Sequence, residues 1–209
     1  MNYHNKNLHF EFNRFGDSTF VYEFLPSEVK HHDIINIKIP KDNLGKGYLN
    51  KRTLLSVSSC GICGKQDLGS IEVTGSKLKE TSQIKYSDLV DWFYTMKENQ
   101  QVFQKTGGLH AMMILNKQGE ILALKEDIGR HNALDKAIGS LLEKQTLKQA
   151  HCLLVSGRVS YEIISKAFIA KIPTVVAVSA CSTLAVDFAK EFGVSLIGFS
   201  RGKKSTIYT

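Results

Sequence analysis

The sequence lacks long hydrophobic runs and contains few cysteines, and both absences limit what the protein can be. No apolar stretch among the 209 residues approaches the ~20 that a membrane-spanning helix needs, so no membrane span is predicted. The first six residues, Met1-Asn2-Tyr3-His4-Asn5-Lys6, lead into no apolar signal core, and we therefore expect a cytoplasmic protein. Four cysteines in a cytoplasmic chain of this length do not indicate a disulfide framework.

The chain also lacks a nucleic-acid recognition signature, although it is basic. It has 27 Lys and Arg against 20 Asp and Glu, a net charge of +7. This excess favours anionic partners such as nucleic acid, phosphorylated cofactors or acidic proteins, and solubility alone would also account for it. Because no helix-turn-helix, zinc-finger or RNA-binding motif is present, we expect no nucleic-acid partner.

The hydrophobic pattern predicts a short N-terminal part and one larger α/β domain. Residues 1–51 form a divergent, irregular segment in which Phe10 to Phe24 and Ile34 to Ile39 alternate as short β-strands do. Residues 52–209 are long enough for one substantial core. In this second part we expect a helix from Ser87 to about Gln104, ended by Gly107-Gly108, and then a β-hairpin.

The last third of the sequence alternates between strand and helix patterns. Short apolar runs predict strands, and longer amphipathic runs predict helices, in the order Cys152 to Val155, Tyr161 to Ala170, Thr174 to Val178, Ser182 to Phe192 and Val194 to Phe199. This β-α-β-α-β order predicts parallel strands with helices packed on the faces of the sheet.

Ligands on such sheets bind beyond the carboxyl ends of the strands. Here those ends are small, polar or basic: Ser156-Gly157-Arg158, Ser179-Ala180-Cys181-Ser182 and Phe199-Ser200-Arg201-Gly202. Two of them run into helix N-termini, which favour phosphate groups. The sequence therefore predicts an anion-binding pocket at this edge.

The densest chemical signal is Cys60-Gly61-Ile62-Cys63-Gly64, with Lys65 one residue further on. The glycines allow both sulfurs to reach an exposed edge, and the nearby cation favours the thiolate. The motif suits half of a zinc site, a redox dithiol, or a sulfur-carrying nucleophile with a helper. The residues that follow it make a poor helix, which does not favour a thioredoxin-type dithiol.

Whether this motif is part of a zinc site depends on the other cysteine and histidine residues that could serve as ligands. The other two cysteines occur singly: Cys152 beside a leucine pair, as in a core, and Cys181 at a strand end, where it either lines the pocket or fills space. A zinc deaminase needs a glutamate two residues after its histidine, and Met112 stands there after His110. A zinc site made by Cys60, Cys63 and His110 stays open as an alternative.

A second polar cluster spans Glu126 to Lys136, where a strand turns into a helix. Asp127 can cap this helix, and Arg130 and His131 fall in its first turn, where backbone amides are free. Either the cluster is a capped helix with a solvated first turn, or Arg130 and His131 donate to a bound anion or nucleotide.

These motifs together resemble the formate dehydrogenase accessory sulfurtransferase family (FdhD). The resemblance covers roughly residues 52 to 209 in five ordered blocks: Ser58 to Lys65, Thr106 to Ala111, Glu126 to Lys136, Ser156 to Glu162 and Gly198 to Gly202. It implies a cytidine-deaminase-like α/β fold and a homodimer. It also implies a carrier that passes persulfide sulfur from a cysteine desulfurase to the molybdenum bis(molybdopterin guanine dinucleotide) cofactor of formate dehydrogenase, with no tightly held metal of its own.

By the family pattern, Cys60 carries the persulfide and Cys63 assists. The segment Phe199-Ser200-Arg201-Gly202-Lys203-Lys204 matches the part that binds the cofactor, and its three basic side chains fit phosphates. Arg130, His131, Ser156, Gly157 and Arg158 complete the expected cofactor contacts. The alternative function is a cofactor- or guanine-nucleotide-binding chaperone without sulfur transfer.

Overall fold

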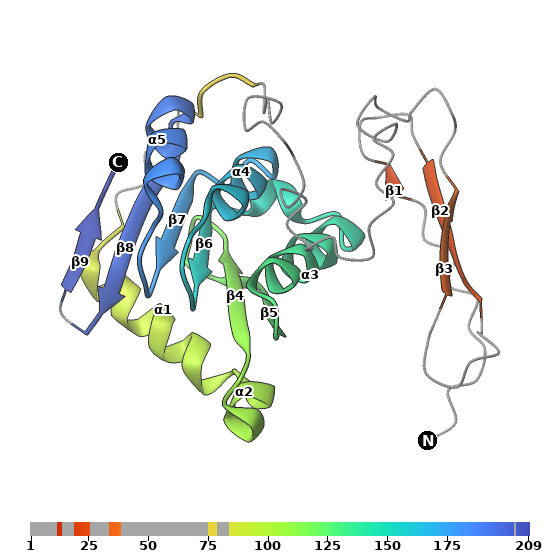
Figure 1. Ribbon diagram of the computed structural model, residues 1–209, viewed down its shortest axis with the longest axis horizontal. Coiled ribbons are helices and arrows are strands. Elements are labelled where there is room, and N and C mark those ends of the chain that lie inside the picture. The colour runs from red at the N-terminus through yellow and green to blue at the C-terminus, as the bar shows by residue number, and fades with distance from the viewer. Residues whose placement is uncertain (1–11, 14–18, 26–33, 39–74, 79–83, 203) are drawn as a thin grey trace. The chain divides into compact units, whose positions relative to one another are not determined.

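The computed structural model describes residues 12–13, 19–25, 34–38, 75–78, 84–202 and 204–209 (Figure 1). The chain divides into two units, Met1–Leu55 and Ser56–Thr209. The boundary that the sequence suggests, between residues 51 and 52, stays a prediction. Within the described residues, no helix is both long and apolar enough to cross a membrane.

The first unit contains a three-stranded antiparallel sheet in the order β1-β2-β3. Its strands are β1 (Phe12–Asn13), β2 (Thr19–Leu25) and β3 (Ile34–Lys38). Strands β2 and β3 pair from Val21 opposite Lys38 to Leu25 opposite Ile34. The alternating pattern in this part of the sequence thus corresponds to strands.

The second unit is built on a six-stranded mixed sheet in the order β5-β4-β6-β7-β8-β9. Its strands are β4 (His110–Leu115), β5 (Ile121–Asp127), β6 (Cys152–Val155), β7 (Thr174–Ala177), β8 (Ser195–Arg201) and β9 (Lys204–Ile207). Strands β6, β7 and β8 are parallel, and β4, β5 and β9 join antiparallel. The predicted parallel β-α-β-α-β unit is confirmed, and the fold class is mixed α/β.

Helices cover both faces of this sheet (Figure 1). They are α1 (Tyr86–Glu98), α2 (Gln101–Thr106), α3 (Arg130–Glu143), α4 (Tyr161–Ile169) and α5 (Thr183–Phe192), with a short 3₁₀ turn, η4, at Leu147–Gln149. Helices α3, α4 and α5 pack together on one face, and α1 packs on the other. The sheet is therefore buried on two sides, which explains why its central strands are apolar throughout.

Strand β4 shows how the two cores share one strand. Met112 and Ile114 belong to the core under α3, α4 and α5, whereas Ala111, Met113 and Leu115 belong to the core under α1. Successive side chains of a strand point to opposite faces, so an uninterrupted apolar run serves both cores.

The helix expected from Ser87 to about Gln104 is wrong in its continuity. It begins at Tyr86 and breaks at Asn99 and Gln100, and α2 restarts from Gln101. Gln100 has φ −79° and ψ 72°, outside the helical region, and its side chain is buried. Its end is as expected, since Gly107 follows α2 in the left-handed region with φ 67°.

Candidate functional site

Five strand termini meet at one edge of the large sheet. Strands β6, β7 and β8 are parallel, so their carboxyl ends lie at the same edge. Strand β4 runs antiparallel to both β5 and β6, and its first residue, His110, pairs with Asp127 at the end of β5. The polar strand ends that the sequence singles out are thereby gathered as expected for an α/β sheet.

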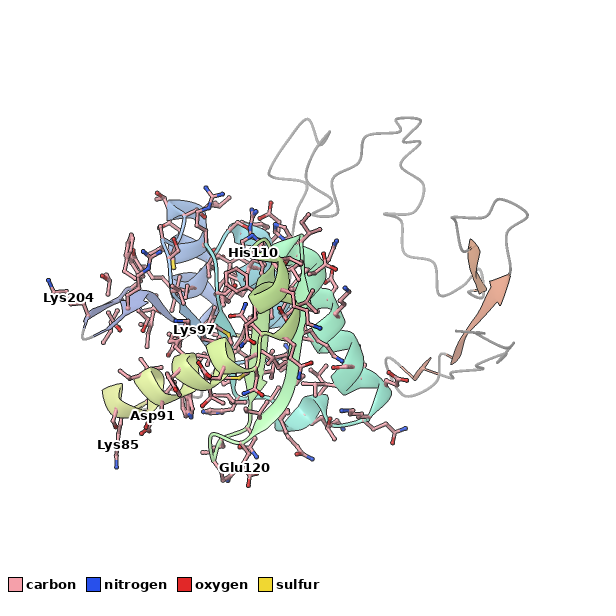
Figure 2. All side chains as sticks on the ribbon, turned by 90° about the horizontal axis from the view of Figure 1, so that it is seen from below. Lys85, Asp91, Lys97, His110, Glu120 and Lys204 are labelled. Atoms are coloured by element: carbon pink, nitrogen blue, oxygen red, sulfur yellow. The ribbon has the colours of Figure 1, made fainter. Side chains whose placement is uncertain are left out.

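A pocket of about 820 Å³ opens at this edge, on the face covered by α1. One wall comes from α1 and the segment after it, and the other from the strand ends. The lining residues are Leu89, Val90, Phe93, Tyr94, Met96, Lys97, Gln100, Phe103, Gly107, Gly108, Leu109, His110, Ser156, Val178, Ser200, Arg201 and Gly202. Lys97 and His110 are labelled in Figure 2. The volume of the pocket falls in the range of about 300–1,000 Å³ that is typical of small-molecule sites.

The β8–β9 hairpin supplies the basic rim of the pocket. Arg201 donates from Nε to the carbonyl oxygen of Val178 at 2.9 Å, which fixes the guanidinium beside the end of β7. Ser200 is buried and pairs with Ser205 across the hairpin, hydroxyl to hydroxyl at 2.9 Å. The remaining guanidinium donors of Arg201 suit an anionic ligand, because its planar fork matches phosphate geometry.

His110 and Ser156 connect the start of β4 with the end of β6. The Ser156 hydroxyl oxygen accepts from the backbone N–H of Ala111 at 2.8 Å, and the Ser156 N–H donates to the Ala111 carbonyl at 3.1 Å. Burial lowers the pKa of His110, and the positive charges of Arg130 and Arg158 lower it further. The imidazole is therefore neutral near pH 7, so it can accept a hydrogen bond or a proton there.

Arg130 and His131 open helix α3, as the sequence predicts, but neither lines the pocket. The N-cap residue of α3, Gly129, has no side chain to cap the helix. Asp127 binds the turn before the helix instead: its Oδ1 accepts from Gly129 N–H at 2.8 Å and from Asn132 Nδ2 at 3.3 Å. His131 is buried, and burial, followed by the charge of Arg130, lowers its pKa. Arg130 lies close enough to His110 for its charge to lower the pKa of that imidazole.

The structure brings together four of the predicted cofactor contacts and leaves others outside the pocket. Ser156, Ser200, Arg201 and Gly202 line it. Among the predicted contacts outside the lining, Gly157 packs against the His110 ring, Arg158 is exposed, Phe199 is 47% exposed, and Lys204 lies at the tip of the hairpin (Figure 2). Cys60, Cys63 and Lys203 lie outside the described residues.

Sequence reasoning missed the wall that α1 and the following segment contribute. Phe93, Tyr94 and Lys97 line the pocket from α1, and Gly107 and Gly108 line it after α2. The signal for the second group was present, since residues 106–111 form one of the resembling blocks. The first group carries only an ordinary amphipathic pattern, and its role depends on where α1 docks.

The two described cysteines are structural. Cys152 is buried in the core under α1, and burial raises its thiol pKa to about 12. Cys181 is half-buried, packs against the opposite core beside Gly198, and burial raises its pKa to about 11. Neither thiol ionises near neutral pH, so neither suits a nucleophile. The described residues also bring no three His, Cys, Asp or Glu side chains together as a metal site would require.

Known proteins resemble this chain along most of its length. The model of the FdhD/NarQ family matches residues 24–209. A protein named sulfur carrier protein FdhD from Saccharolobus solfataricus is 41% identical over 185 residues, covering 85% of this chain and 70% of that one. Proteins of the same name from Sulfurisphaera tokodaii (41% identical; 93% and 78% covered) and Nocardia farcinica (45% identical; 76% and 58% covered) also match.

A solved structure supports the fold. The crystal structure of a candidate formate dehydrogenase accessory protein from Desulfotalea psychrophila superposes with a TM-score of 0.55 at 23% identity, covering 59% of this chain and 53% of that one. Fold and site define a mixed α/β protein with a basic-rimmed pocket at the carboxyl edge of its sheet. By its sequence, the chain belongs to the FdhD/NarQ family.

Proposed function

We propose that this protein is a sulfur carrier in the maturation of formate dehydrogenase. It receives persulfide sulfur from a cysteine desulfurase on Cys60 and delivers it to the molybdenum bis(molybdopterin guanine dinucleotide) cofactor, which is its bound substrate. The observation that carries the proposal is the 820 Å³ pocket with Arg201 held at its rim. The names of the relatives support the sulfur-carrier half of the proposal.

The lining of the pocket suits a nucleotide-containing cofactor. Phe93, Tyr94 and Phe103 offer aromatic side chains against which a planar heterocycle can pack. Arg201 and Lys97 offer positive charge to phosphates. The proposal therefore places a guanine nucleotide portion of the cofactor in the pocket, with its phosphates toward the β8–β9 hairpin.

The loading step is a thiol–persulfide exchange. The Cys60 thiolate, favoured by Lys65, attacks the outer sulfur of the desulfurase persulfide. A new S–S bond forms on Cys60, the S–S bond on the desulfurase breaks, and the desulfurase cysteine leaves as a thiolate. No net oxidation or reduction occurs in this step.

The delivery step requires two electrons, because the outer sulfur must leave as sulfide. The Cys63 thiolate attacks Sγ of Cys60, the bond to the outer sulfur breaks, and sulfide passes to molybdenum. The two thiols are left as a Cys60–Cys63 disulfide, so the dithiol supplies both electrons. This gives the second cysteine of the motif a defined role as the helper.

The remaining parts of the proposal follow the family resemblance. The protein is a sulfurtransferase that acts as a homodimer in the cytoplasm, on a cytidine-deaminase-like scaffold whose chemistry has changed. Met112, fully buried in β4, stands where a deaminase needs its glutamate, which supports that change.

The loading step can be tested with purified components. We would incubate the protein with a cysteine desulfurase and cysteine, and map persulfide by intact and peptide mass spectrometry. We expect one added sulfur on Cys60 in the wild type and in Cys181→Ala, and none in Cys60→Ala. If the desulfurase turns over and Cys60 stays unmodified, the carrier role is wrong.

Persulfide mapping together with a measurement of guanosine diphosphate affinity distinguishes the alternative function from the carrier role. A cofactor-binding chaperone without sulfur transfer would bind guanosine diphosphate with unchanged affinity in a Cys60→Ala, Cys63→Ala double variant and would show no adduct. Tight nucleotide binding together with an adduct on Cys60 supports the carrier.

A further inference from the structure

Glu126, near the end of β5, binds the first turn of α2 across 23 and 24 positions of sequence. Its Oε2 accepts from the backbone N–H of Phe103 at 2.7 Å, and its Oε1 accepts from the N–H of Val102 at 3.1 Å. The first amides of a helix have no partner within it, and Gln100 at the N-cap position provides no side-chain bond. A carboxylate from another element therefore caps this helix.

Within the part of the chain that the structure describes, helix α2 has few other contacts that hold it against the sheet. None of its six residues is buried; Phe103 is half-buried and the others are exposed. Further hydrogen bonds connect it to the end of α1, such as Gln104 Nε2 donating to the Glu98 carbonyl at 2.9 Å. Since hydrophobic burial is the usual anchor of a helix, an unburied six-residue helix depends on such polar contacts.

The position of α2 sets one wall of the pocket. Phe103 lines the pocket from the helix, and Gly107, Gly108 and Leu109 line it from the segment that leads into β4. Gly107 adopts φ 67°, so the chain turns sharply there between two fixed points, the cap at Phe103 and the start of β4. A shift of α2 would therefore move this wall.

We propose that Glu126 is a positioning residue: by capping α2 from strand β5, it holds residues 102–109 as the wall of the pocket. The role deepens the proposed function, since the ligand that the wall contacts is the one proposed above. Glu126 does not itself line the pocket, so it acts through α2.

The first test measures the wall without any ligand. In the full-length protein, amide hydrogen exchange is followed by mass spectrometry over residues 101–110 in the wild type, Glu126→Gln and Glu126→Ala. Glutamine keeps one acceptor oxygen and alanine keeps none. We expect exchange of Val102 and Phe103 to accelerate about fivefold in Glu126→Ala, with Glu126→Gln intermediate, because a lost cap weakens a helix start by such a factor.

The matched control is Glu143→Gln, which removes the same charge from an exposed site at the end of α3. Exchange over residues 101–110 should stay at the wild-type rate in this variant. Wild-type protection of Val102 and Phe103 in Glu126→Ala would overturn the proposal.

The second test measures affinity for guanosine diphosphate by calorimetry. We expect the Kd to rise at least threefold in Glu126→Ala, to rise less in Glu126→Gln, and to stay unchanged in Glu143→Gln. Faster exchange with an unchanged Kd would overturn the positioning role. If the wild type binds no nucleotide, the cofactor half of the proposed function is wrong, and the exchange data still decide whether Glu126 holds the wall.

Discussion

The imidazole of His110 lies against Gly157, with Nδ1 3.1 Å from the place where a Cβ on Gly157 would stand. The two residues come from different strands: His110 begins β4, and Gly157 follows β6 after Ser156. Because the glycine has no side chain, the imidazole packs directly against its backbone, while Ser156 binds the backbone of the next residue, Ala111, and both His110 and Ser156 are among the residues that line the pocket.

Replacing Gly157 with alanine should displace His110 without unfolding the protein. Its φ does not lie in the left-handed region, so alanine is tolerated by the backbone, but the new methyl group crowds the ring at 3.1 and 3.3 Å. We expect a loss of about 1 kcal/mol in unfolding free energy. We also expect a rise in the Kd for guanosine diphosphate, checked by calorimetry beside urea denaturation. Wild-type affinity in a folded Gly157→Ala variant would show that the position of His110 is irrelevant to the pocket.

At Gly139, inside α3, we expect the opposite effect of an alanine on stability. Apart from the backbone of its own helix, a Cβ there meets no atom of the described residues within 4 Å, and the residue is only partly buried. Since glycine is a poor helix former, Gly139→Ala should stabilise the protein by about 0.5–1 kcal/mol, measured by urea denaturation. Nucleotide affinity should remain at the wild-type value, because Gly139 lies outside the pocket lining. A destabilised variant would contradict the open space seen beside this residue.

Arg201 should contribute to nucleotide binding through both its charge and its shape. Arg201→Ala removes a cation at the rim, and we expect the Kd for guanosine diphosphate to rise roughly tenfold or more, as for a lost charge-assisted hydrogen bond. Arg201→Lys keeps the charge but lacks the planar guanidinium, including the Nε donor that binds Val178, so it should recover only part of the affinity. Lys190→Ala, on the exposed side of α5, is the control for net charge. Equal affinity in all three variants would mean that the phosphates of the nucleotide do not bind at this rim.

The two described thiols should resist alkylation in the folded protein. Burial raises the pKa of Cys152 to about 12 and that of Cys181 to about 11, so the thiolate that reacts is scarce at pH 7.5. Brief treatment with iodoacetamide, followed by peptide mass spectrometry, should modify neither residue. All four cysteines should react after unfolding in urea. Rapid native labelling of Cys181 would identify it as a reactive thiol and contradict its assignment as a structural residue.

The sequence allowed the parallel strands to be predicted because their signal is local. Strands β6 and β7 are short apolar runs between amphipathic helices, and helix α5 begins within one residue of the predicted Ser182, whose hydroxyl caps it. Strand β9 was not predicted, because Lys204–Ile207 is short and polar and becomes a strand only by pairing with β8. Edge strands often lack an apolar signature for this reason.

The pocket was predictable on one side only. Ser156 follows β6, and Ser200 and Arg201 are the last two residues of β8, so the topology of the sheet fixes where they gather. The opposite wall depends on the break between α1 and α2, where the local sequence favours one continuous helix. Tertiary contacts decide the outcome at this break, since the partner of the Val102 and Phe103 amides is Glu126, far along the chain.

Asp127, next to Glu126, faces the other side of the sheet and should make the protein sensitive to acid. Its carboxylate accepts from Gly129 N–H and from Asn132, and it forms an ion pair with Lys136. The Lys136 bond, followed by the Gly129 bond, lowers the pKa of Asp127 below its ordinary value. A carboxyl group whose pKa is depressed by folding stabilises the native state above its unfolded pKa of about 3.9, and this contribution is lost as the pH falls through the folded pKa.

Asp127→Asn should therefore destabilise the protein by about 1 kcal/mol at pH 7, where the wild-type carboxylate is charged and favours the start of α3. The difference from the wild type should shrink as the pH is lowered below about 3.9, because protonation removes the same charge. Urea denaturation of both proteins at a series of pH values measures this difference directly. A difference that stayed constant across the series would mean that the amide disturbs packing, and that the charge of Asp127 does not stabilise α3.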